Sequence, residues 1–181
     1  MTKKSTQREI GEFILAFVAA WIIYQLLALV TGSALPVVSI VSDSMYHGPN
    51  NNSYMCSIKV DRPHTLGEFW EKCSGDYVQY NITKDQFRSF IAPSGMSRGD
   101  LLLVVRDDHP SIGSVLIYQR AGSSFTIVHR LVAVGDSYYI VKGDNNKIAD
   151  PHVPKNAIIG RVVLAVPVLG YPRLLLHMVG I

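Results

Sequence analysis

Three kinds of side chain that can together carry out covalent catalysis occur near the ends of apolar segments in this sequence. Ser44 follows an apolar run in the motif Ser-Asp-Ser-Met, and His129 lies in an apolar segment that reads Ile-Val-His-Arg. Asp144 and Asp150 follow a later apolar run. A serine nucleophile, a histidine base and a carboxylate that orients the histidine form a relay for attack on a carbonyl carbon. The sequence predicts such a relay, and from the residues alone either aspartate can supply the carboxylate.

Each of these residues also has a purely structural interpretation. Ser-Asp-Ser is common turn chemistry, and so is the Gly-Asp-Asn-Asn run around Asp144. By strand alternation His129 shares a face with apolar neighbours such as Leu131, where a histidine commonly has only a structural part. His152, close to Asp150 in sequence, is a competing base. Geometry decides among these interpretations.

The segment before Ser44 is long and apolar enough to span a membrane. Residues 13–30 are almost all apolar, and a helix needs about 20 such residues, flanking positions included, to cross a bilayer. The basic residues ahead of this segment predict that residues 1–12 stay in the cytoplasm and that the body is exported. A cleavable secretory signal that ends near Gly32 is the alternative. An uncleaved anchor would hold Ser44 close to the outer membrane face.

The body that follows, residues 35–166, reads as a series of short strands. Runs rich in β-branched residues, bounded by Gly-Asp and Gly-Ser pairs, are typical of strands joined by tight turns. The pattern predicts a mostly β fold, in which an antiparallel β catalytic domain follows an N-terminal transmembrane helix. The predicted strands cover 35–41, 101–106, 115–120, 126–134, 138–142 and 158–166.

Two further segments differ in character from this body. Residues 46–95 are polar and rich in turn clusters, which predicts a small inserted lobe. Within it we expect short helices at 66–72 and at 84–90, the second capped by Thr83. The tail, residues 167–181, is apolar but contains two prolines and an arginine. It therefore predicts a hydrophobic edge that rests on the membrane rather than a second span.

The composition limits the classes of function. The chain is 48% hydrophobic and 17% charged, which indicates contact with a membrane. Its net charge of +3, with no basic run, argues against nucleic-acid binding. The histidines show no metal-ligand spacing, and the loop around Asp144 lacks the glycine and glutamate of a calcium loop. Cys56 and Cys73 form no CxxC pair, so a disulfide and two free thiols are both open. Asn51 and Asn81 begin glycosylation motifs.

In its motifs the chain resembles signal peptidase I, specifically the archaeal and endoplasmic-reticulum branch. The motifs follow one order after an N-terminal span, and together they extend over most of the chain outside residues 46–95. They are Ser42-Asp43-Ser44-Met45, Met96-Ser97-Arg98-Gly99-Asp100-Leu101, Ile127-Val128-His129-Arg130, and Lys142-Gly143-Asp144-Asn145-Asn146 with Asp150. The chain departs from the family at Ser114, where a second Gly-Asp pair is common. Residues 46–95 match nothing in the family.

This resemblance implies a role for each matching residue. Ser44 is the expected nucleophile, and His129 stands where the bacterial branch has a lysine. Asp150 matches the triad aspartate, and Asp144 matches a second carboxylate that is important to the site. The hydroxyl of Ser42 is expected to build the oxyanion hole together with the Ser44 amide. A histidine base needs an aspartate to hold its tautomer, and the match favours Asp150 for this role.

The same resemblance implies a reaction and a location. It predicts a membrane-bound serine endopeptidase that removes signal peptides from exported preproteins without a metal or an organic cofactor. The signal peptide would bind in extended form, with small residues at positions −1 and −3 before the cut. The enzyme would be a single-pass protein of the cell membrane, in contact with lipid, with a cytoplasmic N-terminus and its catalytic domain on the outer face. The sequence assigns no complex subunits to it.

Two other functions remain open at this stage. One is a processing peptidase that uses a serine and a lysine on a related β fold, against which the Val-His-Arg motif argues. The other is a non-enzymatic, anchored β-domain that binds cell-surface ligands. The second would be favoured if Ser44, His129 and Asp150 could each be replaced by alanine without loss of protein processing.

Overall fold

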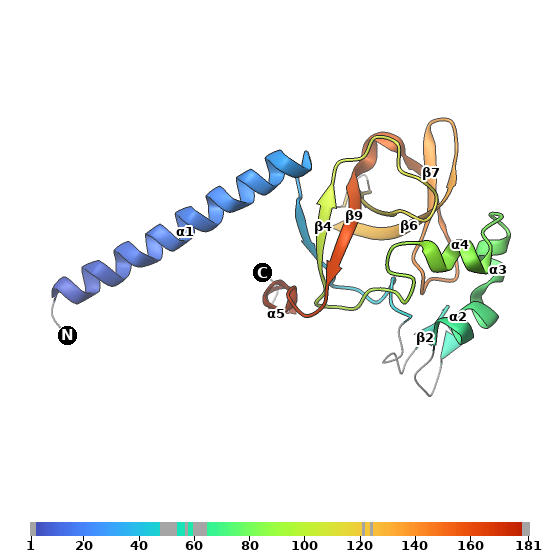
Figure 1. Cartoon of the computed structure of the whole chain (residues 1–181), viewed down its shortest axis with the longest axis horizontal. Coiled ribbons are helices and arrows are strands. Elements are labelled where there is room, and N and C mark those ends of the chain that lie inside the picture. Colours follow the sequence, from blue (N-terminus) through green and yellow to red (C-terminus); the bar gives the residue numbers. More distant parts are fainter. Residues whose placement is uncertain are drawn as a thin grey trace.

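A long helix precedes a β-rich body in the computed structural model (Figure 1). The structure describes residues 3–47, 54–56, 58–59, 65–120, 122–123 and 125–178. Helix α1 covers Lys3–Thr31, and its stretch Gln7–Thr31 is long and apolar enough to cross a membrane. None of the most apolar part of this stretch is buried against the body. The large apolar side chains of α1 are therefore exposed unless a bilayer covers them.

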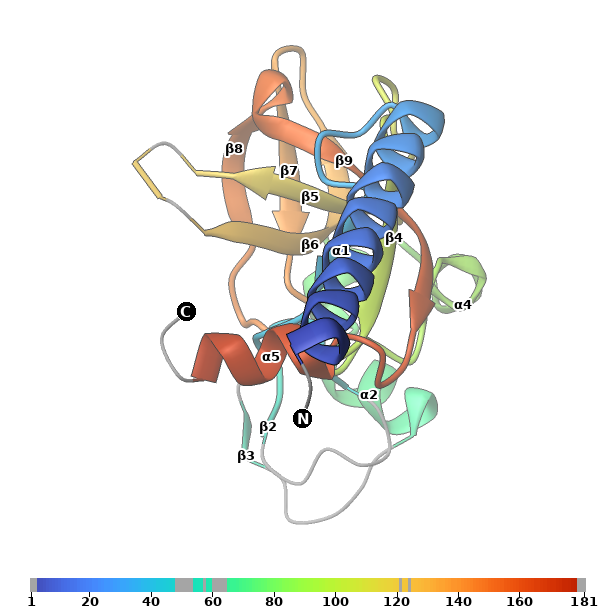
Figure 2. The same ribbon diagram turned by 90° about the vertical axis from the view of Figure 1, so that its left-hand side faces the viewer.

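Seven strands form one curled antiparallel sheet, which confirms the predicted mostly β fold (Figures 1 and 2). The order of the strands across the sheet is β1-β4-β9-β5-β6-β7-β8. Every neighbouring pair is antiparallel. Their bounds are β1 Val37–Ser39, β4 Leu101–Val105, β5 Val115–Gln119, β6 Thr126–Val134, β7 Tyr138–Lys142, β8 Asp150–Pro154 and β9 Ile158–Val166.

Strand β8 was not predicted from the sequence. Two prolines lie within its five residues, and proline cannot donate to a ladder of hydrogen bonds. The strand is nevertheless at the edge of the sheet, where proline is tolerated because one side of the strand needs no partner. A short 3-10 turn, Lys155–Ala157, then leads from β8 into β9.

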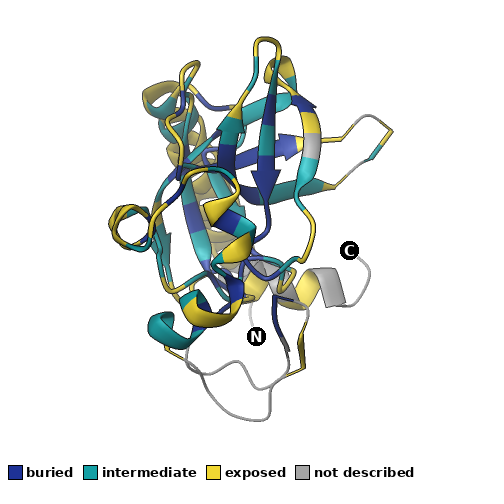
Figure 3. Ribbon diagram, turned by 90° about the vertical axis from the view of Figure 1, so that its right-hand side faces the viewer, coloured by how far each residue is buried: buried dark blue, intermediate teal, exposed yellow. Residues whose placement is uncertain are grey.

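Both faces of the central strand β5 are buried, and they separate two parts of the core. Ile117 packs on one side with a cluster that includes Leu102 and Met45. On the other side Leu116 and Tyr118 pack with residues of β6, β7 and β8. Figure 3 shows the buried positions gathered along the strands and the exposed ones along the loops. A side chain on this second face of β5 is therefore shielded from water even when it is polar.

The inserted segment forms a small helical lobe with its own aromatic core. It contains α2 Leu66–Cys73, α3 Gly75–Val78 and α4 Lys84–Ser89, together with the hairpin of β2 Tyr54–Met55 and β3 Ile58–Lys59. The helices predicted at 66–72 and 84–90 are confirmed, and Thr83 caps α4 as expected. Phe69, Tyr77 and Phe87 are fully buried, and they pack with Val132 of β6. The lobe and the sheet therefore share one buried core at Val132.

Cys56 and Cys73 form a disulfide within this lobe, which resolves the choice that the sequence left open. The bridge joins the hairpin side of the lobe to the end of α2. Of the two glycosylation motifs, Asn81 lies in an exposed turn, whereas Asn51 lies outside the described residues.

A short helix, α5 Tyr171–Met178, follows β9. Pro172 is tolerated because it lies in the first turn of the helix, where the N–H of a residue has no partner in any case. Eight residues rise only about 12 Å, too little to cross a bilayer. Several apolar side chains here are exposed, among them Leu169, Tyr171, Leu175 and Leu176.

Candidate active site

His129 and Asp150 form a direct pair, although they come from different strands. His129 lies on β6, and its Nδ1 is 2.8 Å from Oδ2 of Asp150, the first residue of β8. The imidazole is almost fully buried, and about a quarter of the carboxylate is exposed. The hydroxyl of Tyr118 on β5 donates to the same Oδ2 at 2.5 Å, and Nη2 of Arg120 is 3.2 Å from Oδ1.

These contacts determine how the imidazole is protonated. The hydrogen bond from His129 contributes most to lowering the pKa of Asp150, to about 2. The hydrogen bond from Tyr118 and the positive charge of Arg120 act in the same direction. Asp150 is therefore a carboxylate near neutral pH and can only accept hydrogen bonds. The Nδ1 atom of His129 must carry the proton that it shares with Asp150, which leaves the lone pair of a neutral ring on Nε2. On a neutral ring, that atom can act as a base.

Ser44 lies in a tight turn after β1 that the Met96–Leu101 motif holds from the other side. Its Oγ is 3.2 Å from Oγ of Ser42, and Ser44 is half-buried. The next residue, Met45, is buried, and its carbonyl accepts from the amide of Met96 at 2.9 Å. Gly95 has a φ of +82° and approaches the Met45 carbonyl so closely that a Cβ would lie 2.6 Å from it. Glycine is therefore required beside this turn.

The loop between β7 and β8 contacts both Ser44 and His129. The amide of Asn145 donates to the Ser44 carbonyl at 2.7 Å. One residue on, Nδ2 of Asn146 is 3.4 Å from Nε2 of His129. A Cβ on Gly143 would lie 2.8 Å from the same Nε2. One short loop thus contacts both the turn that carries Ser44 and the imidazole of His129. At Gly143 there is no space for a larger side chain.

An open groove of about 500 Å³ joins these residues. Ser42, Ser44 and His129 line it together with residues of β1 and the first half of β6, most of them apolar. Within the described chain, β1 pairs only with β4, and the Thr126–His129 half of β6 pairs only with β5. The groove therefore lies between two strand edges whose backbone groups are open to another chain.

Asp144 lies in a different environment from Asp150. It is completely buried, and Nε and Nη2 of Arg130 contact its carboxylate at 2.7 to 3.2 Å. The hydroxyl of Tyr77 donates to it at 2.9 Å, and Nε2 of His47 lies 3.2 Å away. Burial alone would raise the pKa of Asp144, but Arg130 and the hydrogen bond from His47 hold it well below its usual value.

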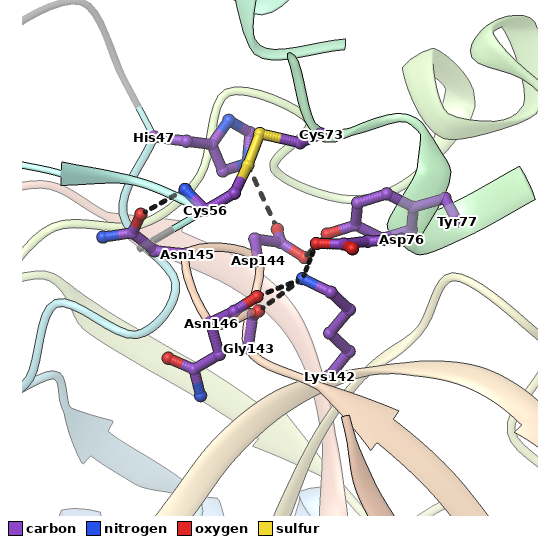
Figure 4. Close-up of a disulfide and its surroundings, with 10 residues drawn as sticks. All are labelled: His47, Cys56, Cys73, Asp76, Tyr77, Lys142, Gly143, Asp144, Asn145 and Asn146. Atoms are coloured by element: carbon purple, nitrogen blue, oxygen red, sulfur yellow. Dashed lines mark hydrogen bonds and ion pairs between the residues drawn. A yellow bond between two sulfur atoms is a disulfide. The ribbon is translucent and has the colours of Figure 1, made fainter. Parts of the chain in front are cut away.

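Polar contacts also join the lobe to the loop between β7 and β8 (Figure 4). The Lys142 ammonium donates to the carbonyls of Gly143 at 3.1 Å and of Asn146 at 2.6 Å, and it pairs with Asp76 of the lobe. Burial lowers the pKa of this lysine. The amide of Cys56, next to the disulfide, donates to Oδ1 of Asn145 at 3.0 Å. The lobe therefore holds the loop through hydrogen bonds and an ion pair.

The described residues contain no group of three or more His, Cys, Asp or Glu side chains that could hold a metal. The competing base, His152, is exposed and packs its ring against Tyr138, with the ring centroids 4.5 Å apart. The aspartate next to it in sequence instead contacts His129. The described groove residues Ser44 and His129 are of types that can attack a carbonyl carbon and transfer a proton.

Several catalytic subunits of the signal peptidase complex match part of the chain. The SEC11 subunit from Debaryomyces hansenii is 32% identical over 94 residues, which is 44% of this chain and 56% of the relative. SEC11 from Colletotrichum graminicola is also 32% identical over 94 residues, 44% of this chain and 55% of its own length. SEC11C from Canis lupus familiaris is 28% identical over 95 residues, 44% of this chain and 50% of its own length.

The chain is similar to signal peptidase catalytic subunits. It spans about half the length of the curated relatives it matches. No protein-family model matches the chain. The similarity agrees with the family resemblance that the order of motifs indicates.

Beside the residues that resemble those of signal peptidases, the structure adds three that the sequence did not single out. Tyr118 and Arg120 contact Asp150, and Asn146 contacts His129. Asn146 lies in the Lys-Gly-Asp-Asn-Asn motif, so the motif itself carried a signal for it. Tyr118 is on β5 and Arg120 directly follows that strand, and nothing in their spacing relates them to Asp150. Asp150 begins β8, and β6 and β7 separate β8 from β5 in the sheet, so only the pairing of all four strands in the curled sheet brings these residues together.

Proposed function

We propose that this protein is a membrane-bound serine endopeptidase that removes signal peptides from exported preproteins. The observation that carries the proposal is that Ser44 and His129 line the same groove. Nδ1 of His129 is hydrogen-bonded to Asp150, which leaves Nε2 for the reaction. The similarity to SEC11 catalytic subunits supports the choice of reaction and substrate.

The proposed chemistry assigns one task to each side chain. Nε2 of His129 takes the proton of Ser44 as its Oγ attacks the scissile carbonyl carbon, and Asp150 stabilises the positive ring that results. The Ser44 amide and the Ser42 hydroxyl donate to the oxygen that becomes negative. The ring then gives its proton to the departing amine, which leaves an ester on Ser44. Water, deprotonated by the same nitrogen, cleaves the ester and restores the serine.

The groove suits an extended peptide. A strand laid between β1 and the open half of β6 would find backbone partners on the edges of both. Alternate side chains of an extended strand point the same way, so residues −1 and −3 would face the same wall. That wall includes Val38, Ile40 and Val128, so residues −1 and −3 would both face apolar side chains, and we propose that these select small residues. The bound segment would thus be the end of a signal peptide.

The same proposal includes an arrangement in the membrane. Residues 13–30 anchor the chain, residues 1–12 remain in the cytoplasm, and the peptidase domain of residues 35–166 with its 46–95 lobe is on the outer face. Because Ser44 follows the anchor closely in sequence, the groove stays near the place where signal peptides emerge. The exposed apolar residues of the 167–181 tail rest on lipid.

A cleavage assay with a matched pair of serine variants tests this function. The full chain is purified in detergent and mixed with a labelled preprotein, and the products are compared for wild type, Ser44→Ala and Ser137→Ala. Ser137 is an exposed serine in the turn between β6 and β7. We expect wild type and Ser137→Ala to cleave at the signal-peptide junction and Ser44→Ala to leave the preprotein intact.

The names of the relatives describe them as subunits of a complex, so the assay is repeated with the chain in its native membrane. Equal cleavage by wild type and Ser44→Ala would exclude Ser44 as the nucleophile. Absence of wild-type cleavage in both settings would exclude the proposed reaction.

A further inference from the structure

Tyr118 is buried at the point where the pair of His129 and Asp150 meets β5. Only 1% of the residue is exposed. Its hydroxyl is 2.5 Å from Oδ2 of Asp150 and 3.3 Å from Nδ1 of His129. Oδ2 is also the oxygen that accepts from His129. The phenol therefore contacts both members of the pair at the one oxygen that joins them.

Asp150 needs such a support because of its place in the fold. It is the first residue of an edge strand, and the loop before it exposes Lys147 and Ile148. On the sheet, Asp150 pairs only with Val141 of β7. A carboxylate at the end of an edge strand can rotate about its side-chain bonds unless other groups fix it. Tyr118 holds Oδ2, and Arg120 holds Oδ1 from the more exposed side.

We infer that Tyr118 is a positioning residue that fixes the Asp150 carboxylate so that it orients His129 for proton transfer. This inference rests on the proposed function. It goes beyond the three residues of the relay, because it adds a fourth that touches neither the substrate nor the attacking oxygen. Its effect on the reaction passes through the pair of Asp150 and His129.

The protonation of the groups that meet here supports this assignment. Burial, followed by the hydrogen bond to Asp150, raises the pKa of Tyr118 well above that of an exposed tyrosine. The phenol therefore keeps its proton across the working pH range and is always a donor. Among the described residues, Arg120, which follows β5, contacts Asp150, and Asn146, in the loop after β7, contacts His129.

The test compares Tyr118→Phe with Tyr139→Phe in the full chain. Both tyrosines are buried in the same core cluster, but Tyr139 lies beside Lys155 rather than beside Asp150. Each change removes one hydroxyl and keeps the ring, so packing is preserved. For Tyr118→Phe we expect kcat on a preprotein to fall roughly tenfold, as for other groups that orient a reacting side chain, while KM changes by less than about twofold. Tyr139→Phe should keep the wild-type kcat.

A second measurement does not depend on activity. In protein labelled with ¹⁵N-histidine, the Nδ1 proton of His129, bonded to Asp150, should give a downfield, slowly exchanging resonance. In Tyr118→Phe the less constrained carboxylate should broaden this resonance, whereas Tyr139→Phe should leave it unchanged. If wild type fails to cleave any preprotein, the proposed function is wrong, and this resonance still decides the role of Tyr118.

Two results would overturn the inference. One is a Tyr118→Phe variant with wild-type kcat and an unchanged Nδ1 resonance. The other is an equal loss of activity in Tyr118→Phe and Tyr139→Phe together with equally lowered unfolding temperatures. The second result would assign both hydroxyls to stability alone.

Discussion

Asp144 and Asp150 have the same side chain but opposite surroundings. Asp150 is half-buried and bonds to His129, whereas Asp144 is buried against the guanidinium of Arg130. The sequence left open which of them orients the imidazole, because the two lie in one short segment. The local pattern Gly-Asp-Asn-Asn indicates a turn between β7 and β8, but it does not predict the direction in which that turn points each carboxylate. We propose that Asp150 serves the reaction and that Asp144 serves the fold.

Replacing each aspartate by asparagine should separate these two roles. Asp150→Asn keeps the shape of the side chain but can stabilise the wrong imidazole tautomer, so we expect kcat to fall by roughly 10³–10⁴-fold. Asp144→Asn leaves Arg130 buried without a charge partner, which should cost about 3–5 kcal/mol of unfolding free energy. Cleavage rates and denaturant unfolding of both variants provide the comparison.

Asp85→Asn is the control, because Asp85 is an exposed residue of α4 that pairs with the exposed Arg88. It should change neither quantity. The division of roles would be wrong if Asp150→Asn cleaved at the wild-type rate, or if Asp144→Asn unfolded at the wild-type denaturant concentration.

The low pKa of Asp150 also predicts how its contribution to stability depends on pH. Its pKa falls from an ordinary 3.8 to about 2 in the folded chain. A carboxylate with a lowered pKa stabilises the fold above its unfolded pKa, and this stability is lost as the pH falls through its folded pKa. The difference in unfolding midpoint between wild type and Asp150→Asn should therefore be full above about pH 4 and shrink towards pH 2. A difference that stays constant from pH 5 to pH 2 would contradict this.

At the scale of the elements, local patterns predicted what depends on local chemistry. The bounds 126–134, 138–142 and 158–166 coincide with β6, β7 and β9, because each run is rich in β-branched residues and ends at a turn. The helix cap at Thr83 was visible for the same reason. Strand β8 was not, since its prolines are acceptable only at a sheet edge, and its position at the edge follows from the pairing of all strands.

The disulfide gives the lobe a role that can be measured. It closes a loop of 17 residues, and a bridge over such a loop stabilises a fold by about 3 kcal/mol. The Cys56 amide also holds Asn145, whose own amide bonds to Ser44. A double change of Cys56→Ser and Cys73→Ser should therefore lower the unfolding free energy by roughly 2–4 kcal/mol and also reduce kcat. Reduction of wild type with a thiol should reproduce both effects. An unchanged unfolding free energy and an unchanged kcat in the double variant would show that the disulfide supports neither the fold nor the active site.

At the scale of the whole molecule, the apolar N-terminal helix and the β-rich body were both predictable, because composition and periodicity extend over long segments. The groove that Ser44 and His129 line, and the hydrogen bond between His129 and Asp150, were not, except through the resemblance to signal peptidases. Ser44 follows β1, at one end of the strand order, whereas His129 is on β6 and Asp150 begins β8, towards the other end. The curl of the sheet and the loop from Gly143 to Asn146 close that distance.

The proposed arrangement in the membrane predicts a pattern of protease protection. In sealed vesicles whose cytoplasmic face is outward, residues 35–166 should resist added protease, and only residues 1–12 should be accessible to it. Detergent should abolish the protection. Digestion of the body in intact vesicles would place it on the cytoplasmic side and reverse the proposed orientation.

The most direct test of the central claim is a double-mutant comparison of Ser44 and His129. The rate of preprotein cleavage is measured for Ser44→Ala, His129→Ala and the variant that carries both changes. If the two side chains act in one relay, each single change should remove nearly all of the activity, and the double variant should be no slower than either single variant. Losses that multiply in the double variant, or wild-type activity in either single variant, would show that the two residues do not act together.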